Sequence, residues 1–128
     1  MSEALFRCTV PGRPIVKKNT QRTVGFGKAR HVIYSQRYMA WELVAIAACK
    51  RAFNTALITC PLEAQFRFYF ADCQAEPDTS NLIEGIQDVL QTASIIKDDK
   101  QIFRLGAEKF LFQEPRTEVE LFKLVRVA

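Results

Sequence analysis

Histidine and paired cysteines are scarce in this 128-residue chain. His31 is its only histidine, and the cysteines Cys8, Cys49, Cys60 and Cys73 are widely separated, with no C-x-x-C pair. Zinc sites are built from closely spaced cysteine and histidine ligands. The composition therefore argues against a zinc site and predicts free, buried thiols.

Long apolar runs are also missing. No stretch approaches the roughly 20 apolar residues that cross a bilayer, and no charged-then-apolar leader opens the chain. With 48% hydrophobic and 25% charged residues, the composition is typical of a soluble globular protein. We therefore expect a single domain over residues 1–128, located in the cytoplasm and with no membrane partner.

Acidic residues are absent between Ala4 and Trp41, although the net charge of the chain is only +4. This segment contains eight basic residues: Arg7, Arg13, Lys17, Lys18, Arg22, Lys28, Arg30 and Arg37. Segregation of one charge favours a polyanionic partner such as DNA more strongly than the total charge does. The alternative interpretation is a generic solubilising surface.

The centre of this basic segment, about residues 11–34, is predicted to be a long loop. Proline and glycine break it near its start, and it has little apolar periodicity. A long loop inside a small domain is usually functional or disordered, and we expect this one to become ordered on DNA. Its candidate nucleic-acid contacts are Lys17, Lys18, Asn19, Arg22, Lys28 and Arg30.

Four segments are predicted to be strands. Residues 62–71 alternate between apolar and polar with a period of two, and residues 5–10 do so less strictly. Residues 101–112 and 117–127 are expected to form a hairpin. With a helix from about Ser35 to Phe53 and a second after residue 78, the chain predicts an α+β fold. In that fold a small mixed or antiparallel sheet packs with two main helices.

An acidic site is predicted at about residues 76–102. Thr79 or Ser80 can cap a helix there, and at about 100° per residue its apolar side chains share one face. The opposite face carries oxygen-bearing side chains: Ser80, Asn81, Glu84, Gln87, Asp88 and Gln91. Asp78 lies just before this helix, and a turn with Asp98 and Asp99 follows it.

Carboxylates gathered without histidine or cysteine suit hard cations, which take oxygen ligands. In a basic chain such a group suggests metal-assisted chemistry on a phosphate. The alternative is that the acidic stripe is only a solvated helix face. Adjacent residues point in different directions, so we expect one of Asp98 and Asp99 to be a ligand and the other an auxiliary group.

The order of these residues resembles the RusA family of Holliday-junction resolvases, which is common in prophages. The pattern Pro-Asp-x-x-Asn-Leu, then Asp-x-Leu, then Asp-Asp-x-Gln-Ile is formed by Pro77, Asp78, Asn81, Leu82, Asp88, Leu90, Asp98, Asp99, Gln101 and Ile102. Residues 14–19 are similar to the opening loop of that family. The resemblance implies a small, dimeric, Mg²⁺-dependent endonuclease that cuts four-way DNA junctions symmetrically, with Mn²⁺ as a possible substitute.

Two positions depart from the family pattern. Ser80 stands where the family usually has a second aspartate, and Glu84 stands where it often has a lysine. Ser80 and Glu84 are four residues apart on one helix face, so Glu84 can supply the carboxylate that Ser80 lacks.

The resemblance places direct metal ligands at Asp78 and Asp99, with Asp88 or Glu84 completing the shell. Lys97 and Lys100 are candidates for the stabilising role of the missing lysine. Two other functions stay open at this point: a catalytically weakened or inactive junction-binding protein of the same fold, and a phage structural protein with an incidental acidic stripe.

Overall fold

The computed structural model describes residues 3–16, 22–24, 31–33, 36–53, 55–73 and 77–125. Its elements, in chain order, are β1 (Phe6–Pro11), β2 (Arg22–Val24), β3 (His31–Ile33), α1 (Gln36–Ala52), β4 (Leu62–Tyr69), α2 (Thr79–Thr92), the short 3₁₀ helix η2 (Asp99–Gln101), β5 (Ile102–Phe110) and β6 (Arg116–Lys123). Strands and helices are both present, and the α+β class predicted from the sequence is confirmed.

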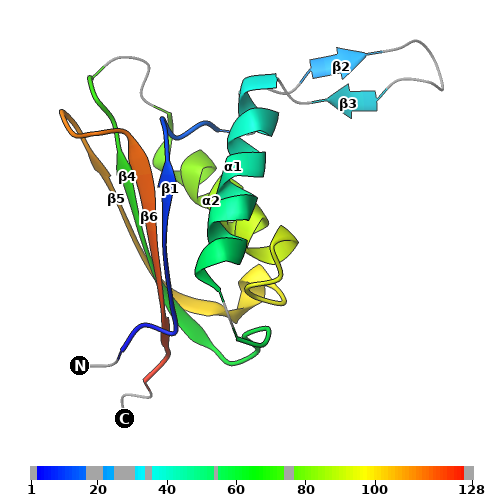
Figure 1. Cartoon of the computed structure of the whole chain (residues 1–128), viewed down its shortest axis with the longest axis vertical. Coiled ribbons are helices and arrows are strands. Elements are labelled where there is room, and N and C mark those ends of the chain that lie inside the picture. Colours follow the sequence, from blue (N-terminus) through cyan, green and yellow to red (C-terminus); the bar gives the residue numbers. More distant parts are fainter. Residues whose placement is uncertain are drawn as a thin grey trace.

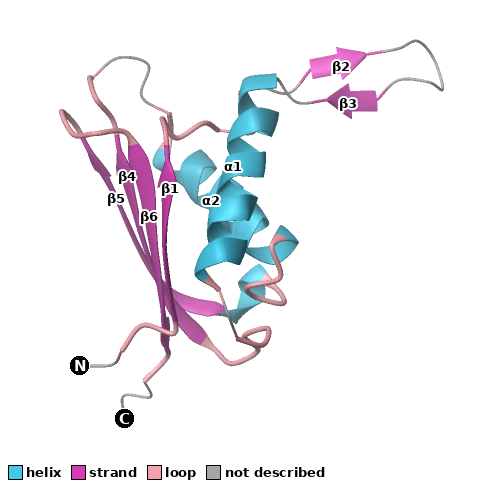
Figure 2. Ribbon diagram, in the orientation of Figure 1, coloured by secondary structure: helices cyan, strands magenta, loops and turns pink. Residues whose placement is uncertain are grey.

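The four longer strands form one mixed sheet in the order β1-β6-β4-β5. β4 and β5 are parallel and are joined through α2, whereas β6 is antiparallel to both β1 and β4. Parallel neighbours need a long crossover connection, and α2 provides it. Both helices lie on the same side of the sheet, so its other face is left open (Figures 1 and 2).

The hairpin predicted for residues 101–127 is wrong. β5 and β6 pair with opposite edges of β4 and not with each other. The connection between them passes the end of β4, where the Phe70 amide donates to Phe110 O and the Gln113 amide donates to Phe70 O. The inward side chains of β4 are all buried, so this strand is central and takes a neighbour on each edge.

The predicted loop at about residues 11–34 is wrong in part, because it contains a short antiparallel pair. β2 pairs with β3 in the register Arg22↔Ile33, Thr23↔Val32 and Val24↔His31. β-Branched residues favour strands, but three-residue strands are too short for a period of two to be recognised. The pair extends away from the sheet beyond the start of α1 (Figure 1).

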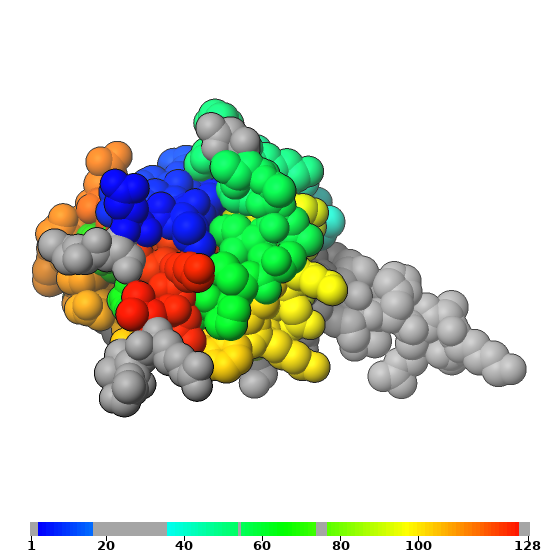
Figure 3. Space-filling view, turned by 90° about the horizontal axis from the view of Figure 1, so that it is seen from below, coloured from blue at the N-terminus to red at the C-terminus, as the bar shows by residue number. Residues whose placement is uncertain are grey.

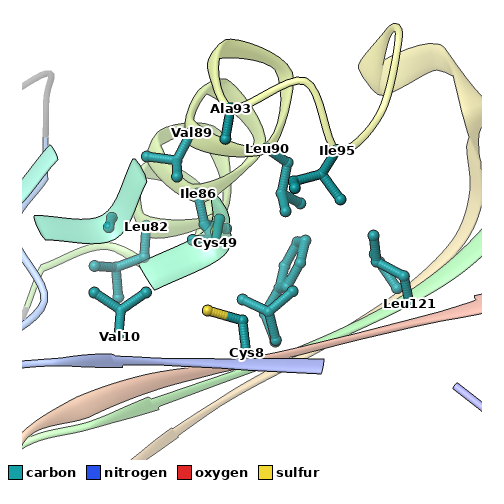
Figure 4. Packing of buried hydrophobic residues seen from close by; sticks show 14 of the residues in the cluster. Cys8, Val10, Cys49, Leu82, Ile86, Val89, Leu90, Ala93, Ile95 and Leu121 are labelled. Carbon is teal, nitrogen blue, oxygen red and sulfur yellow. The ribbon is translucent and has the colours of Figure 1, made fainter. Parts of the chain in front are cut away.

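The core lies between the sheet and the two helices. Figure 4 shows Cys8 and Val10 of β1 directed towards the helix that carries Leu82 and Ile86. All four are buried, as is Trp41 of α1. The prediction of buried thiols holds for Cys8 and Cys49 but not for Cys60, which is half-buried, or Cys73, which is exposed.

The start of β1 lies beside the end of β6 on the surface seen in Figure 3. The Leu5 amide donates to Leu121 O over 2.7 Å, which fixes this edge of the sheet. None of the helices in the described part of the chain has the length and apolar character that a membrane span needs.

Candidate functional site

Asp78 caps the N-terminus of α2, where Thr79 or Ser80 had been predicted to do so. Its backbone is extended (φ −62°, ψ 133°), and its Oδ1 accepts hydrogen bonds from the Ser80 amide at 3.1 Å and the Ser80 hydroxyl at 2.9 Å. Aspartate is a strong capping residue, and its charge is favoured at the positive end of the helix dipole. Ser80 therefore contacts Asp78 directly.

The two predicted faces of α2 are confirmed. Its buried side chains are Leu82, Ile86, Val89 and Leu90, with Ala93 just beyond. On the other side Ser80 and Glu84 are exposed and Asp88 is half-buried. These three residues are four positions apart, so they lie one above the other along the helix. The stripe runs from the Asp78 end towards the turn after α2.

That turn is held by Asp98 and Gln101. Asp98 caps η2 by accepting from the Lys100 amide at 2.9 Å, while Gln101 Oε1 accepts from the Asp98 and Lys97 amides. The Gln101 amide nitrogen donates to the carbonyls of Ile58 (2.9 Å) and Cys60 (3.1 Å). The glutamine of the sequence motif is thus a brace that ties the acidic turn to the segment before β4.

The pKa values of the neighbouring Asp98 and Asp99 are shifted in opposite directions. The pKa of Asp98 is lowered, first by the Lys100 amide and then by its bond with Asp99. The pKa of Asp99 is raised by that bond with Asp98, by partial burial and by the negative charges of Asp98 and Asp88. Asp98 therefore serves the cap, whereas Asp99 is exposed and within the electrostatic reach of Asp88.

Asp78 and Asp99 lie at opposite ends of α2. The 14-residue helix is about 21 Å long at 1.5 Å per residue. Asp78 caps its first turn, while the Asp99 amide donates to Gln91 Oε1 near its last turn, over 3.2 Å. A crossover helix between two parallel strands runs from the end of the first to the start of the second, which separates the two acids.

The donor chemistry of these residues fits Mg²⁺, which prefers carboxylate and carbonyl oxygens and keeps several waters. Their grouping fits it less well. Within residues 3–16, 36–53, 55–73 and 77–125, no three acidic, histidine or cysteine side chains are close enough to hold one ion. The metal ligands predicted from the sequence therefore lie in two places within one chain. Asp78 lies at one end of α2, and Asp88 and Asp99 lie at the other.

A comparison with known families matches residues 11–122 to the family described as endodeoxyribonuclease RusA. The chain belongs to the RusA family. It is also 43% identical over 44 residues to the uncharacterized protein YqaN of Bacillus subtilis (strain 168). That match covers 34% of this chain and 30% of YqaN, so the chain spans less than a third of that relative.

The basic residues predicted to contact DNA are only partly described. Lys97 and Lys100 are exposed on either side of Asp98, and their positive charges lower its pKa. The backbone of Arg22 begins β2. The other predicted contacts lie outside the described residues: Lys17, Lys18, Asn19, Lys28 and Arg30.

Two contacts near the RusA-family motif were not predicted from the sequence. Lys109 Nζ donates to Pro77 O over 3.1 Å, so a side chain of β5 reaches the residue before Asp78. The second joins Asp72 Oδ1 to Arg13 Nη1 over 3.5 Å. A signal for Lys109 was present in the sequence, since it interrupts the apolar alternation of Leu105, Ala107 and Leu111.

Proposed function

We propose that this RusA-family nuclease is a Mg²⁺-dependent endonuclease that resolves four-way DNA junctions as a homodimer. The observation that carries the proposal is the acidic stripe of α2, which is followed by the turn that holds the carboxylates of Asp98 and Asp99. Hard-cation ligands on a chain with an acid-free, basic segment suit hydrolysis of a phosphodiester. Family membership supports a DNA substrate.

Dimerisation accounts for the separation of Asp78 from Asp99. If α2 of one copy lies antiparallel to α2 of the other across a twofold axis, the first turn of one helix adjoins the last turn of its mate. Asp78 of one copy then lies beside Asp88 and Asp99 of the second copy, and two equivalent sites result. Isologous dimers are the commonest oligomers, and two sites match the symmetry of a four-way junction.

Within each composite site the residues take distinct roles. Asp78 and Asp99 hold the ion, and Asp88 or Glu84 completes the shell or orients a water. Bound Mg²⁺ would neutralise charge on the phosphate and lower the pKa of a water. Lys97 and Lys100 contact the phosphate beside the acidic turn. The basic segment binds the DNA backbone through Lys17, Lys18, Asn19, Arg22, Lys28 and Arg30.

The open face of the sheet is a poor DNA surface, because its arginines are already paired. Arg67 contacts Glu120 at 2.6 Å and Glu118 at 3.0 Å. Arg7 contacts Glu120 at 2.7 Å, and Arg116 contacts Glu118 at 2.9 Å. DNA phosphates would have to break these pairs. We therefore place the DNA on the side of the sheet that carries the helices.

Incubation of the protein with an end-labelled mobile four-way junction or a linear duplex tests the proposal. Mg²⁺, Mn²⁺ and EDTA are compared. We expect paired nicks in opposite junction strands, dependent on metal and absent from the duplex. The variant Asp99→Asn should bind the junction without cutting it. Equal cutting of junction and duplex, or cutting in EDTA, contradicts the proposal.

A second candidate is a junction-binding protein with little or no cleavage. It is favoured by Ser80, which replaces an acid of the family pattern and bonds to Asp78 Oδ1 at 2.9 Å. This candidate predicts tight junction binding with no nick in any metal. Ser80→Asp should then create cleavage, whereas an unchanged rate in an active wild type supports Glu84 as the replacement ligand.

A further inference from the structure

Lys109 occupies a position where an apolar side chain would be expected. It is paired with Phe68 in the β4–β5 register, so the two side chains lie on the same side of the sheet. Phe68 is 1% exposed and faces the helices. Lys109 is half-buried and follows Leu105 and Ala107 along the same face of β5. A lysine there gives up part of its hydration, which needs a compensating contact.

The contact is made to the residue that precedes the helix cap. Lys109 Nζ donates to Pro77 O over 3.1 Å, and this carbonyl belongs to the peptide that enters Asp78. Proline has no amide hydrogen, so its carbonyl is its only backbone hydrogen-bonding group. The ammonium therefore fixes the peptide plane between Pro77 and Asp78 from the sheet side.

Ser80 holds the same aspartate from the helix side. Its amide and hydroxyl both donate to Asp78 Oδ1. The backbone of Asp78 is thus fixed by Lys109 and its carboxylate by Ser80. An exposed carboxylate with both its backbone and one oxygen constrained is pre-oriented for a ligand, and outer contacts of this kind tune metal sites.

We propose that Lys109 is a positioning residue for Asp78 in the nuclease reaction. It holds the peptide that enters Asp78, and with it the direction in which the Asp78 carboxylate leaves the backbone. The inference rests on the proposed function, because it assumes that Asp78 is a metal ligand. It adds a residue from β5, outside the acidic helix and turn.

The test compares Lys109→Met, Lys109→Arg and the control Lys123→Met, an exposed strand lysine at the far end of β6. Mn²⁺ affinity is measured by electron paramagnetic resonance without DNA, junction affinity in EDTA, and kcat at saturating junction. We expect Lys109→Met to weaken Mn²⁺ binding and to lower kcat by about tenfold each. Junction affinity should stay within about twofold, Lys109→Arg should recover most of both losses, and the control should behave as wild type.

Three results overturn the inference. One is normal Mn²⁺ affinity and kcat in Lys109→Met. Another is a loss of junction affinity with kcat unchanged, which makes Lys109 a phosphate contact. The third is equal loss in Lys109→Met and Lys109→Arg that follows the folded fraction measured by thermal unfolding. Failure of the wild type to cut any junction overturns the proposed function instead.

Discussion

The amide of Asp99 donates to the side-chain oxygen of Gln91 over 3.2 Å, which ties the acidic turn to the last turn of α2. Gln91 lies on the polar face of the helix, and Asp99 is the more exposed member of the acidic pair. A helix side chain therefore helps to determine where Asp99 lies.

Gln91→Leu should lower junction cleavage without unfolding the protein. The change removes the acceptor of the Asp99 amide, and a small misplacement of a reacting group is costly, so we expect a loss of about tenfold or more in kcat. Single-turnover cleavage at saturating Mg²⁺ measures it. Gln87→Leu, on the same face but one turn earlier, is the control. Normal cleavage by Gln91→Leu would show that Asp99 needs no anchor on α2.

Mixing two inactive variants should restore cleavage if the sites are composite. Asp78→Asn and Asp99→Asn should each be inactive alone, and asparagine preserves the helix cap. In a mixed dimer one site receives both substitutions and the other keeps Asp78 and Asp99. Since roughly half of the dimers in an equal mixture are mixed, nicking of single junction strands should return.

The control mixture pairs Asp78→Asn with the double variant Asp78→Asn/Asp99→Asn, and it should stay inactive. Sites assembled within one chain would leave both mixtures inactive. Nicked product, separated on a denaturing gel, distinguishes these outcomes.

Gln101→Leu should destabilise the fold. The half-buried amide accepts from two backbone amides and donates to two carbonyls, so the substitution leaves several polar groups without partners. We expect a loss of about 2–3 kcal/mol in the free energy of unfolding, measured in urea. Gln113→Leu, at an exposed position in the β5–β6 connection, should change it little. Equal stability of the two variants would mean that the brace is unimportant.

Glu120→Gln should destabilise the protein at neutral pH and matter less in acid. Arg67 and then Arg7 lower the pKa of Glu120 below its ordinary value of 4.5. The ionised side chain therefore stabilises the fold above pH 4.5, and this contribution is lost as the pH falls through the folded pKa. We expect a loss of about 1 kcal/mol at pH 7, measured by urea unfolding.

The difference from wild type should shrink in titrations carried below pH 4.5. Glu108→Gln, an exposed position on β5, serves as the control. A gap between wild type and Glu120→Gln that stays constant down to pH 3 would contradict the assignment of the shift to the two arginines.

The sequence was informative wherever the determinant is local. The alternation of residues 62–71 predicted β4, and the 3.6-residue period separated buried Ile86 from exposed Glu84. Pairing between distant segments has no such local signal. β4 is a central strand with β6 on one edge and β5 on the other, so β5 and β6 do not form a hairpin.

The sequence motif singles out the acidic residues but does not predict how they are arranged in space. Asp78 and Asp99 belong to one sequence motif, yet the crossover helix α2 lies between them. The spacing of residues in a motif does not show whether its two ends meet in the folded chain. The contact from Lys109 to Pro77 joins residues 32 positions apart and depends on the parallel β4–β5 register. Such contacts follow only from the assembled sheet.

β6 is the last strand in the chain, but in the sheet it lies between β1 and β4. This order has a consequence for synthesis on the ribosome. Arg7 of β1 meets Glu120 of β6 across 113 residues of chain. At elongation rates of roughly 5–20 residues per second, β1 has no β6 to pair with for on the order of ten seconds. The backbone groups along β1 are thus unpaired during translation, and we expect chaperones to cover this edge until β6 emerges.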